Sequence, residues 1–106
     1  MATTDAVFRA LADETRRDIL RLLRTGPRTS GEIADRFDSS WPTISRHLSV
    51  LREAGLVTTE RKGQEIHYEL NTTVFEDVAQ HLMGWIKPRQ ANRKPRPGRT
   101  ERGQEV

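Results

Sequence analysis

The chain has 106 residues and no cysteine, with 34% hydrophobic and 31% charged residues. This length fits one small domain with a thin core, and the absence of cysteine excludes disulfides, thiolate metal sites and thiol catalysis. No apolar run is long enough to cross a bilayer and the short, mixed N-terminus does not fit a signal peptide, so we expect a cytoplasmic protein.

Charge is distributed unevenly along the chain. Residues 87–106 hold seven lysines and arginines against two glutamates, a net charge of +5, whereas residues 1–86 hold eleven basic and thirteen acidic groups, a net charge of −2. The last segment also contains three prolines, two glycines and no hydrophobic periodicity, which predicts a disordered basic tail. Residues 1–86 are the predicted folded domain, and nucleic acid would have to bind a local patch on it, assisted by the tail.

Two helices are predicted at the start of this domain. The first, residues 5–12, places Val7, Phe8 and Leu11 on one side. Asp13 is a suitable N-cap for the second, residues 14–24, and Gly26-Pro27 ends it. The arginines of the second helix are expected to lie mostly on a solvated outer face: Arg16, Arg17, Arg21 and Arg24.

A third, short helix leads into a turn. Thr29 and Glu32 have the spacing of a capping box, and the helix that they open is expected to run to Phe37 with Ile33 and Ala34 buried. A tight turn of three or four residues around Asp38-Ser39 then joins it to the next helix. Two helices joined in this way predict a helix-turn-helix.

The fourth helix, residues 40–55, is the centre of the predicted function. Ser40 is its N-cap, Pro42 lies in its first turn and Gly55 ends it. One face is apolar at helical spacing and predicts a buried stripe of Ile44, Leu48 and Leu51. The opposite face carries short hydroxyl side chains around Arg46 with no acid before Glu53, which suits a helix whose N-terminus enters a DNA major groove. An ordinary polar face is the alternative, and the neighbouring elements decide between the two.

A β-hairpin is predicted next and favours the DNA-binding alternative. Residues 56–61 and 65–70 are β-prone, with a turn at 62–64 whose tip carries two cations, and a hairpin after a recognition helix makes a winged helix. Glu60 and Glu65 are expected to keep the rest of the wing away from DNA. The predicted DNA-contacting residues are Ser40, Trp41, Pro42, Thr43, Ser45, Arg46, His47, Ser49, Arg61, Lys62 and Gln64.

The last predicted helix begins at Thr73, with Glu76 completing a second capping box, and ends at Lys87. Its apolar stripe is wider than a terminal helix needs to dock on its own domain, so we expect a homodimer formed through the first and last helices. The predicted interface consists of Val7, Phe8, Leu11, Phe75, Val78, Ala79, Leu82, Trp85 and Ile86. The fold class is thus mainly α with a small hairpin, in the order α-α-α-α-β-β-α.

With these motifs in place, the chain resembles the ArsR (arsenic-repressor) family of dimeric winged-helix repressors. Residues 8–17 with Ile19-Leu20 resemble the N-terminal signature of that family, although Glu14 stands where proline is commoner. Residues 44–48 and 51–57 resemble its recognition helix, and residues 62–63 and 67–70 its wing. Within the family, residues 68–74 are similar to the metal-free autorepressor of a sporulation-delaying toxin operon.

Most sensors of that family bind metals, and this sequence departs from them. The helix that would hold a thiolate site has no cysteine, and on the last helix only Asp77 and His81 have suitable spacing, whereas a tetrahedral site needs four ligands. We therefore expect no metal and no other cofactor. The sequence also has no phosphate-binding glycine loop, nucleophile elbow or paired acids, so an enzyme with a small-molecule substrate is not expected.

The sequence therefore predicts a homodimeric repressor of a palindromic operator on double-stranded DNA, acting on its own promoter and not responding to metal. The resemblance implies release through sequestration by a partner protein, which could lie at the membrane. Two alternatives remain open. One is a small-ligand sensor with an apolar pocket around Trp85 and Phe75 at the dimer interface, and the other is a winged-helix protein-interaction module.

Overall fold

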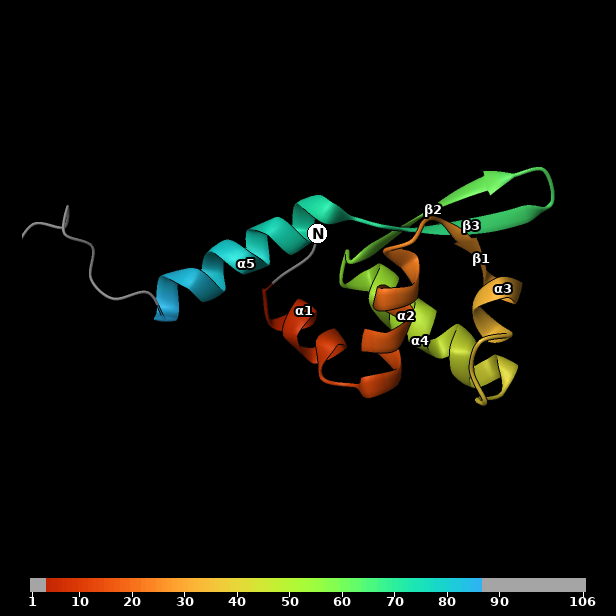
Figure 1. Cartoon of the computed structure of the whole chain (residues 1–106), viewed down its shortest axis with the longest axis horizontal. Helices are drawn as coiled ribbons and strands as arrows, with labels where there is room; N and C mark the ends of the chain where they lie inside the picture. The colour runs from red at the N-terminus through yellow and green to blue at the C-terminus, as the bar shows by residue number, and fades with distance from the viewer. Residues whose placement is uncertain (1–3, 87–106) are drawn as a thin grey trace, which may run out of the picture.

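The computed structural model describes residues 4–86, which form five helices and three short strands (Figure 1). The helices are α1 (Thr4–Leu11), α2 (Glu14–Leu23), α3 (Ser30–Ala34), α4 (Trp41–Glu53) and α5 (Thr72–Ile86), and the strands are β1 (Arg28–Thr29), β2 (Val57–Lys62) and β3 (Glu65–Leu70). The predicted winged helix-turn-helix is confirmed, with β1 as an addition. The tail predicted for residues 87–106 lies outside the described residues. Within residues 4–86, no helix is long and apolar enough to cross a membrane.

Three helices begin where the predicted caps place them. The Asp13 carboxylate accepts a hydrogen bond from the Arg16 backbone N–H at 3.0 Å and caps α2. Before α3, the Thr29 hydroxyl accepts from the Glu32 N–H at 3.1 Å and the Glu32 carboxylate accepts from the Thr29 N–H at 2.9 Å. Ser40 caps α4. Each cap satisfies backbone donors that the first turn of a helix leaves without a partner, so a local contact defines the start of the helix.

The recognition helix α4 ends at a glycine in the left-handed conformation. Gly55 has a φ of 82°, which costs a side-chain-bearing residue strain that glycine avoids. Its N–H donates to the Arg52 carbonyl and the Leu56 N–H donates to the Leu51 carbonyl, both at 3.0 Å. This pair of bonds is a Schellman motif, and Leu51 and Leu56 are both fully buried beside it. The chain is thereby directed from α4 into β2.

The three strands form one antiparallel sheet in the order β1-β3-β2. The hairpin of β2 and β3 turns at Gly63, whose φ is 64°. Strand β1 pairs with the other edge of β3, with Arg28 opposite Tyr68 and Thr29 opposite His67. The sequence did not predict β1, because two residues are too few for any periodicity to be visible. Residues 28 and 29 form a strand because they lie beside the edge of β3 that β2 does not occupy and pair with its backbone groups.

Two element boundaries differ from the sequence prediction. Helix α3 ends at Ala34 and not at Phe37, because the Arg36 and Phe37 N–H groups donate three residues back, to Ile33 and Ala34, and tighten the chain into turns. Residues 35–40 therefore form a longer connection to α4 than the predicted tight turn. Helix α5 starts at Thr72, so Thr73 lies within its first turn and the predicted capping box of Thr73 and Glu76 does not form.

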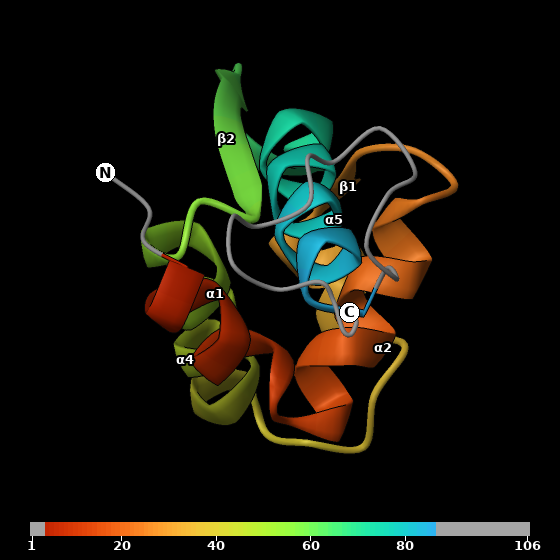
Figure 2. The same ribbon diagram turned by 90° about the vertical axis from the view of Figure 1, so that its left-hand side faces the viewer.

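The core lies between α1, α2, α3, α4 and the start of β2. Its largest fully buried side chains are Val7, Ile19, Ile33, Ile44, Leu48, Leu51, Leu56 and Val57. Helix α5 contributes one buried residue, Val78, to this core. Figure 1 shows α5 leading away from the other helices, at the opposite end of the molecule from the tip of the hairpin, and Figure 2 views it nearly end-on. Most of α5 is consequently left without a covering layer.

Candidate nucleic-acid interface

The outer face of α4 is polar and open to solvent. Ile44, Leu48 and Leu51 point into the core as predicted, which turns the opposite side of the helix outward. Six of the predicted DNA-contacting residues are exposed on this helix and its cap: Ser40, Trp41, Pro42, Ser45, Arg46 and Ser49. The guanidinium of Arg46 forms no hydrogen bond or ion pair with any residue in 4–86. It is therefore available for the bidentate contact that arginine makes with guanine.

The two hydroxyls at the start of α4 are already bonded to each other. The Ser40 hydroxyl accepts from the Thr43 backbone N–H at 3.4 Å and donates to the Thr43 hydroxyl at 3.0 Å. Thr43 is half-buried, and its hydroxyl retains its own proton for a contact outside the chain. These residues therefore both shape the helix N-terminus and present one remaining hydroxyl donor.

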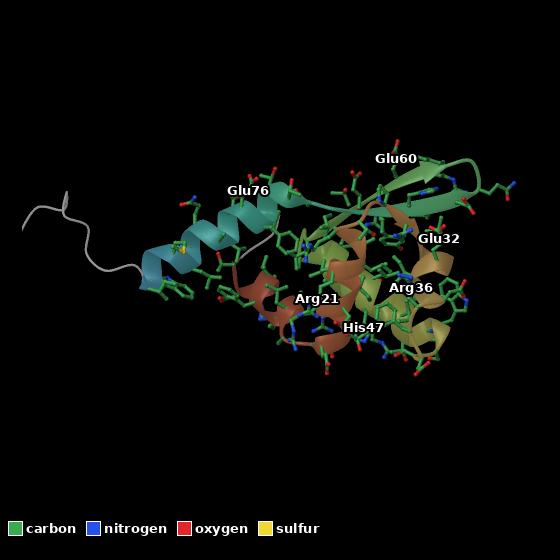
Figure 3. All side chains as sticks on the ribbon, viewed as in Figure 1. Arg21, Glu32, Arg36, His47, Glu60 and Glu76 are labelled. Carbon is green, nitrogen blue, oxygen red and sulfur yellow. The ribbon has the colours of Figure 1, made fainter. Side chains whose placement is uncertain are left out.

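His47 lies differently from its neighbours on α4. Its side chain is only 15% exposed, and its Nδ1 lies 3.3 Å from a terminal nitrogen of Arg16 on α2. Its Nε2 lies 3.9 Å from a carboxylate oxygen of Asp13, the N-cap of α2. The sequence predicts His47 as a base contact, and the structure places its imidazole against Arg16 and Asp13 on the side of α4 that meets α2 (Figure 3).

Arg16 connects three elements, which the sequence did not predict. Its Nε donates to the Ala10 carbonyl at 2.7 Å and one terminal nitrogen donates to the Arg9 carbonyl at 3.0 Å, while the other faces His47. Since a guanidinium only donates, Nδ1 of His47 is the acceptor in this contact. The two carbonyls belong to the last turn of α1, where a positive charge is also favoured by the helix dipole.

The predicted solvated face of α2 is therefore wrong for two of its four arginines. Arg17 donates to the Leu11 carbonyl at 2.8 Å and, like Arg16, is half-buried. Arg21 and Arg24 are exposed, and Arg21 pairs with Asp18. Arg16 and Arg17 differ from Arg21 and Arg24 because their guanidinium groups reach across the turn between α1 and α2 and bond backbone carbonyls of α1. No local sequence pattern carries that information.

Two carboxylates near the interface have a lowered pKa. The backbone N–H of Arg16 is the main cause for Asp13, with a smaller contribution from the positive charge of the Arg16 side chain. For Glu32, the backbone N–H of Thr29 is the main cause of the lowered pKa. Both groups are helix caps, and a hydrogen bond to the charged carboxylate favours the charged form.

The two faces of the wing differ in charge. Directly opposed residues of an antiparallel pair share a face, and Arg61 lies opposite Ile66 while Lys62 lies opposite Glu65. Arg61 therefore shares its end of the wing with an apolar side chain, on the face that leads back through Thr59 and Tyr68 to the core. Lys62 has the Glu65 carboxylate across from it, which weakens its attraction to phosphate, and that carboxylate also lies 3.6 Å from Nε2 of His67. Gln64 and both cations are exposed at the tip, as predicted.

The face of the wing that carries Lys62 is acidic away from its tip. Glu60 lies opposite His67 and Glu69 lies opposite Thr58 on this face. Glu60 and Glu76 of α5 both point away from the helical body (Figure 3). Phosphates would be repelled from this side of the wing.

An apolar surface extends over α5 and α1. Leu82, Trp85 and Ile86 are 40%, 64% and 72% exposed, and the Trp85 ring contacts Phe8 of α1 with centroids 5.6 Å apart. Two residues of the predicted dimer interface, Val7 and Val78, lie instead in the chain's own core. Met83, 46% exposed, adds to the surface and was not predicted. The remaining predicted interface residues are half-buried or exposed: Phe8, Leu11, Phe75 and Ala79.

A groove of about 440 Å³ lies at the junction of α1 and α5. Its lining includes Thr4, Val74 and Gln80 together with Asp77 and His81, but neither Phe75 nor Trp85, around which an apolar pocket was considered. His81 also contacts the Trp85 ring edge-on, with centroids 6.3 Å apart. Within residues 4–86, no three potential metal ligands lie together.

Comparisons with known proteins agree with this geometry. A helix-turn-helix domain model matches residues 11–60. The chain is similar to the transcriptional repressor SdpR of Bacillus subtilis (strain 168), with 48% identity over 80 residues that cover 76% of this chain and 89% of that protein. It is also similar to an arsenic resistance transcriptional regulator of Pseudomonas putida, with 40% identity over 89 residues that cover 83% of this chain and 70% of that protein.

The fold is likewise that of solved regulators. An ArsR-like transcriptional regulator from Rhodococcus sp. RHA1 superimposes with a TM-score of 0.72 at 33% identity, over 77% of each chain. These relatives are transcriptional regulators and not enzymes, which confirms the expectation from the sequence. The exposed face of α4, the wing and these similarities together show that the chain belongs to the ArsR family of winged helix-turn-helix, DNA-binding transcriptional repressors.

Proposed function

We propose that the chain acts as a homodimer that represses transcription from a palindromic operator in its own promoter. The observation that carries the proposal is the polar face of α4, where Arg46 is exposed and unpaired within residues 4–86 and where short hydroxyl side chains leave room for close approach to base edges. Arg46, Ser45 and Ser49 make the base contacts, while the wing tip and the start of α4 hold phosphates and set the register.

The uncovered face of α5 supports the homodimer. Four large apolar side chains of α5 are exposed together near its C-terminal end: Leu82, Met83, Trp85 and Ile86. A group of large exposed apolar side chains is characteristic of an interaction site, and a second copy of the chain supplies the same surface for it. Two-fold symmetry of the protein then requires two-fold symmetry of the operator.

Release from DNA does not require a metal in this proposal. The chain has no cysteine, and Asp77 with His81 supplies only two ligands on α5. Repression is relieved when a partner protein, which could lie at the membrane, sequesters the dimer, as the similarity of residues 68–74 to a metal-free autorepressor implies. Repression of its own promoter rests on the same similarity.

The test is selection of bound fragments from sheared genomic DNA by the purified chain, followed by affinity measurements on the selected site. We expect a short inverted repeat upstream of the gene for the chain itself, bound with a steep salt dependence and much more tightly than random DNA of equal length. Binding without sequence preference would contradict operator recognition. No DNA binding at all would favour the protein-interaction module.

A further inference from the structure

The contact between Arg16 and His47 joins α1 to the recognition helix. Arg16 holds the Arg9 and Ala10 carbonyls at the end of α1 with two of its nitrogens and meets His47 of α4 with the third. The side chain is half-buried, and His47 is 31 residues away in the sequence. A planar guanidinium that meets three acceptors has one orientation, so it fixes the elements that carry those acceptors relative to one another.

Helix α1, which Arg16 contacts, also carries part of the surface proposed for the second copy. Phe8 of α1 contacts Trp85 of α5, and both side chains belong to that surface. A continuous series of contacts therefore runs from Trp85 through α1 and Arg16 to His47, which follows Arg46 directly in the sequence. Each step is a packing contact or a hydrogen-bond contact between named groups, so a physical connection runs from the proposed dimer surface to α4.

We propose that Arg16 is a positioning residue for operator recognition: by holding His47 and the end of α1 together, it sets the angle at which each recognition helix of the dimer meets DNA. This inference rests on the proposed homodimeric function. Two recognition helices in a dimer must enter the major groove about one helical turn, roughly 34–36 Å, apart. A rotation of α4 against α1 shifts both helices relative to each other, although it leaves each one able to contact a single half-site.

The proposal makes a prediction that a purely stabilising role of Arg16 does not make. If the contact only capped α1, its loss would lower the stability of the fold and weaken binding to every DNA alike. If it sets the angle of α4, its loss weakens binding to the complete palindrome, whereas binding to an isolated half-site and to random DNA changes little. His47 provides the cleaner variant, because its replacement leaves the bonds of Arg16 to the carbonyls of α1 in place.

The experiment compares the full chain and its variants on three duplexes of equal length: the selected operator, the same duplex with one half-site randomised, and a random sequence. We expect His47→Leu and Arg16→Lys to lower operator affinity about tenfold and to leave the other two affinities within about twofold. His47→Asn, which places an amide oxygen near the position of Nδ1, should restore operator binding. The double variant should bind the operator no more weakly than the weaker-binding of the two single variants, because each substitution removes the same contact between Arg16 and His47.

Arg21→Lys is the matched control, because Arg21 lies on the same helix but is exposed and bonds only Asp18. Thermal unfolding of each variant shows that it is folded at the temperature of the binding assay. Equal losses on operator and half-site would overturn the proposal, since they would make His47 a direct DNA contact or α4 generally damaged. Unchanged operator affinity in His47→Leu would overturn it as well. A wild-type chain that is monomeric, or that gains nothing from the second half-site, would refute the dimer itself and therefore both proposals.

Discussion

Lys62 and Glu65 lie directly opposite each other across the wing hairpin, while Arg61, the neighbouring cation, lies opposite Ile66. Two adjacent positive charges at the tip are therefore not equivalent. A carboxylate across the strand pair weakens the attraction of Lys62 for a phosphate, whereas Arg61 has no such partner on its face.

We predict that Arg61→Ala makes the slope of log affinity against log salt shallower by about 0.9, the contribution of one phosphate contact, and that Lys62→Ala changes it by less. Glu65→Gln should strengthen binding to operator and random DNA alike, because it removes a repulsive charge without altering any base contact. Titrations at several salt concentrations measure these slopes. Equal effects of the two alanine variants would show that Glu65 does not screen Lys62.

Arg46→Ala should weaken operator binding by about 1–3 kcal/mol, because this guanidinium is the best guanine-binding group on the exposed turns of α4. Binding to random DNA should change much less. Arg52→Ala is the matched control, since Arg52 is exposed on the last turn of the same helix. Competition assays with operator and random duplexes provide both affinities. An equal loss of affinity for the two duplexes would show that Arg46 contacts phosphate and not bases.

Leu82→Glu should dissociate the dimer, because it introduces a carboxylate into an apolar contact. The substitution should leave the fold of the monomer intact, because the Leu82 side chain is 40% exposed in a single chain. Gln80→Glu, an exposed position on the other face of α5, adds the same charge and should leave the dimer unaffected. Light scattering at micromolar concentration measures the mass of each variant. A monomeric wild-type chain would exclude the proposed interface.

Zinc should leave operator affinity unchanged. Asp77 and His81 line one groove, but within residues 4–86 no third ligand joins them, and His81 is packed against Trp85. A site with two ligands does not hold zinc tightly. Operator titrations with added zinc and then with a chelator test this point. A loss of about tenfold that the chelator reverses would mean that the dimer completes a site from ligands of both copies.

Acid should destabilise the fold through two helix caps. The pKa values of Asp13 and Glu32 are lowered in the folded chain, so each carboxylate binds a proton less readily there than in the unfolded chain. Their contribution to the free energy of unfolding is complete above the ordinary values of 3.8 and 4.5, and it is lost as the pH falls through the lowered values. Urea unfolding between about pH 3 and pH 6 should therefore show stability falling at the acid end. Asp13→Asn and Glu32→Gln retain cap acceptors and should flatten this dependence, and an unchanged slope in both would assign acid unfolding to other groups.

Much of this structure follows from contacts between residues three or four apart. The caps at Asp13, Thr29 and Ser40 each bond a backbone N–H in the next turn, and Gly55 needs only its own backbone conformation to end α4. Such contacts are visible in the sequence, because residue type and spacing are sufficient to specify them. The exposed Arg46 face follows in the same way, since burial of Ile44, Leu48 and Leu51 determines which side of the helix remains outside.

The remaining features required the tertiary structure, because their partners are distant in the chain. Two residues, Arg28 and Thr29, become a strand only because the edge of β3 lies beside them. Val7 and Val78 share the helix faces of the predicted interface residues, yet the path of the chain encloses them in its own core. The roles of Arg16 and His47 depend on α2 crossing α4, where an arginine and a histidine that resemble surface residues in the sequence meet across 31 positions. Local chemistry therefore determined where each element begins and which face is polar, whereas the crossing of the helices decided which polar side chains remain free to meet DNA.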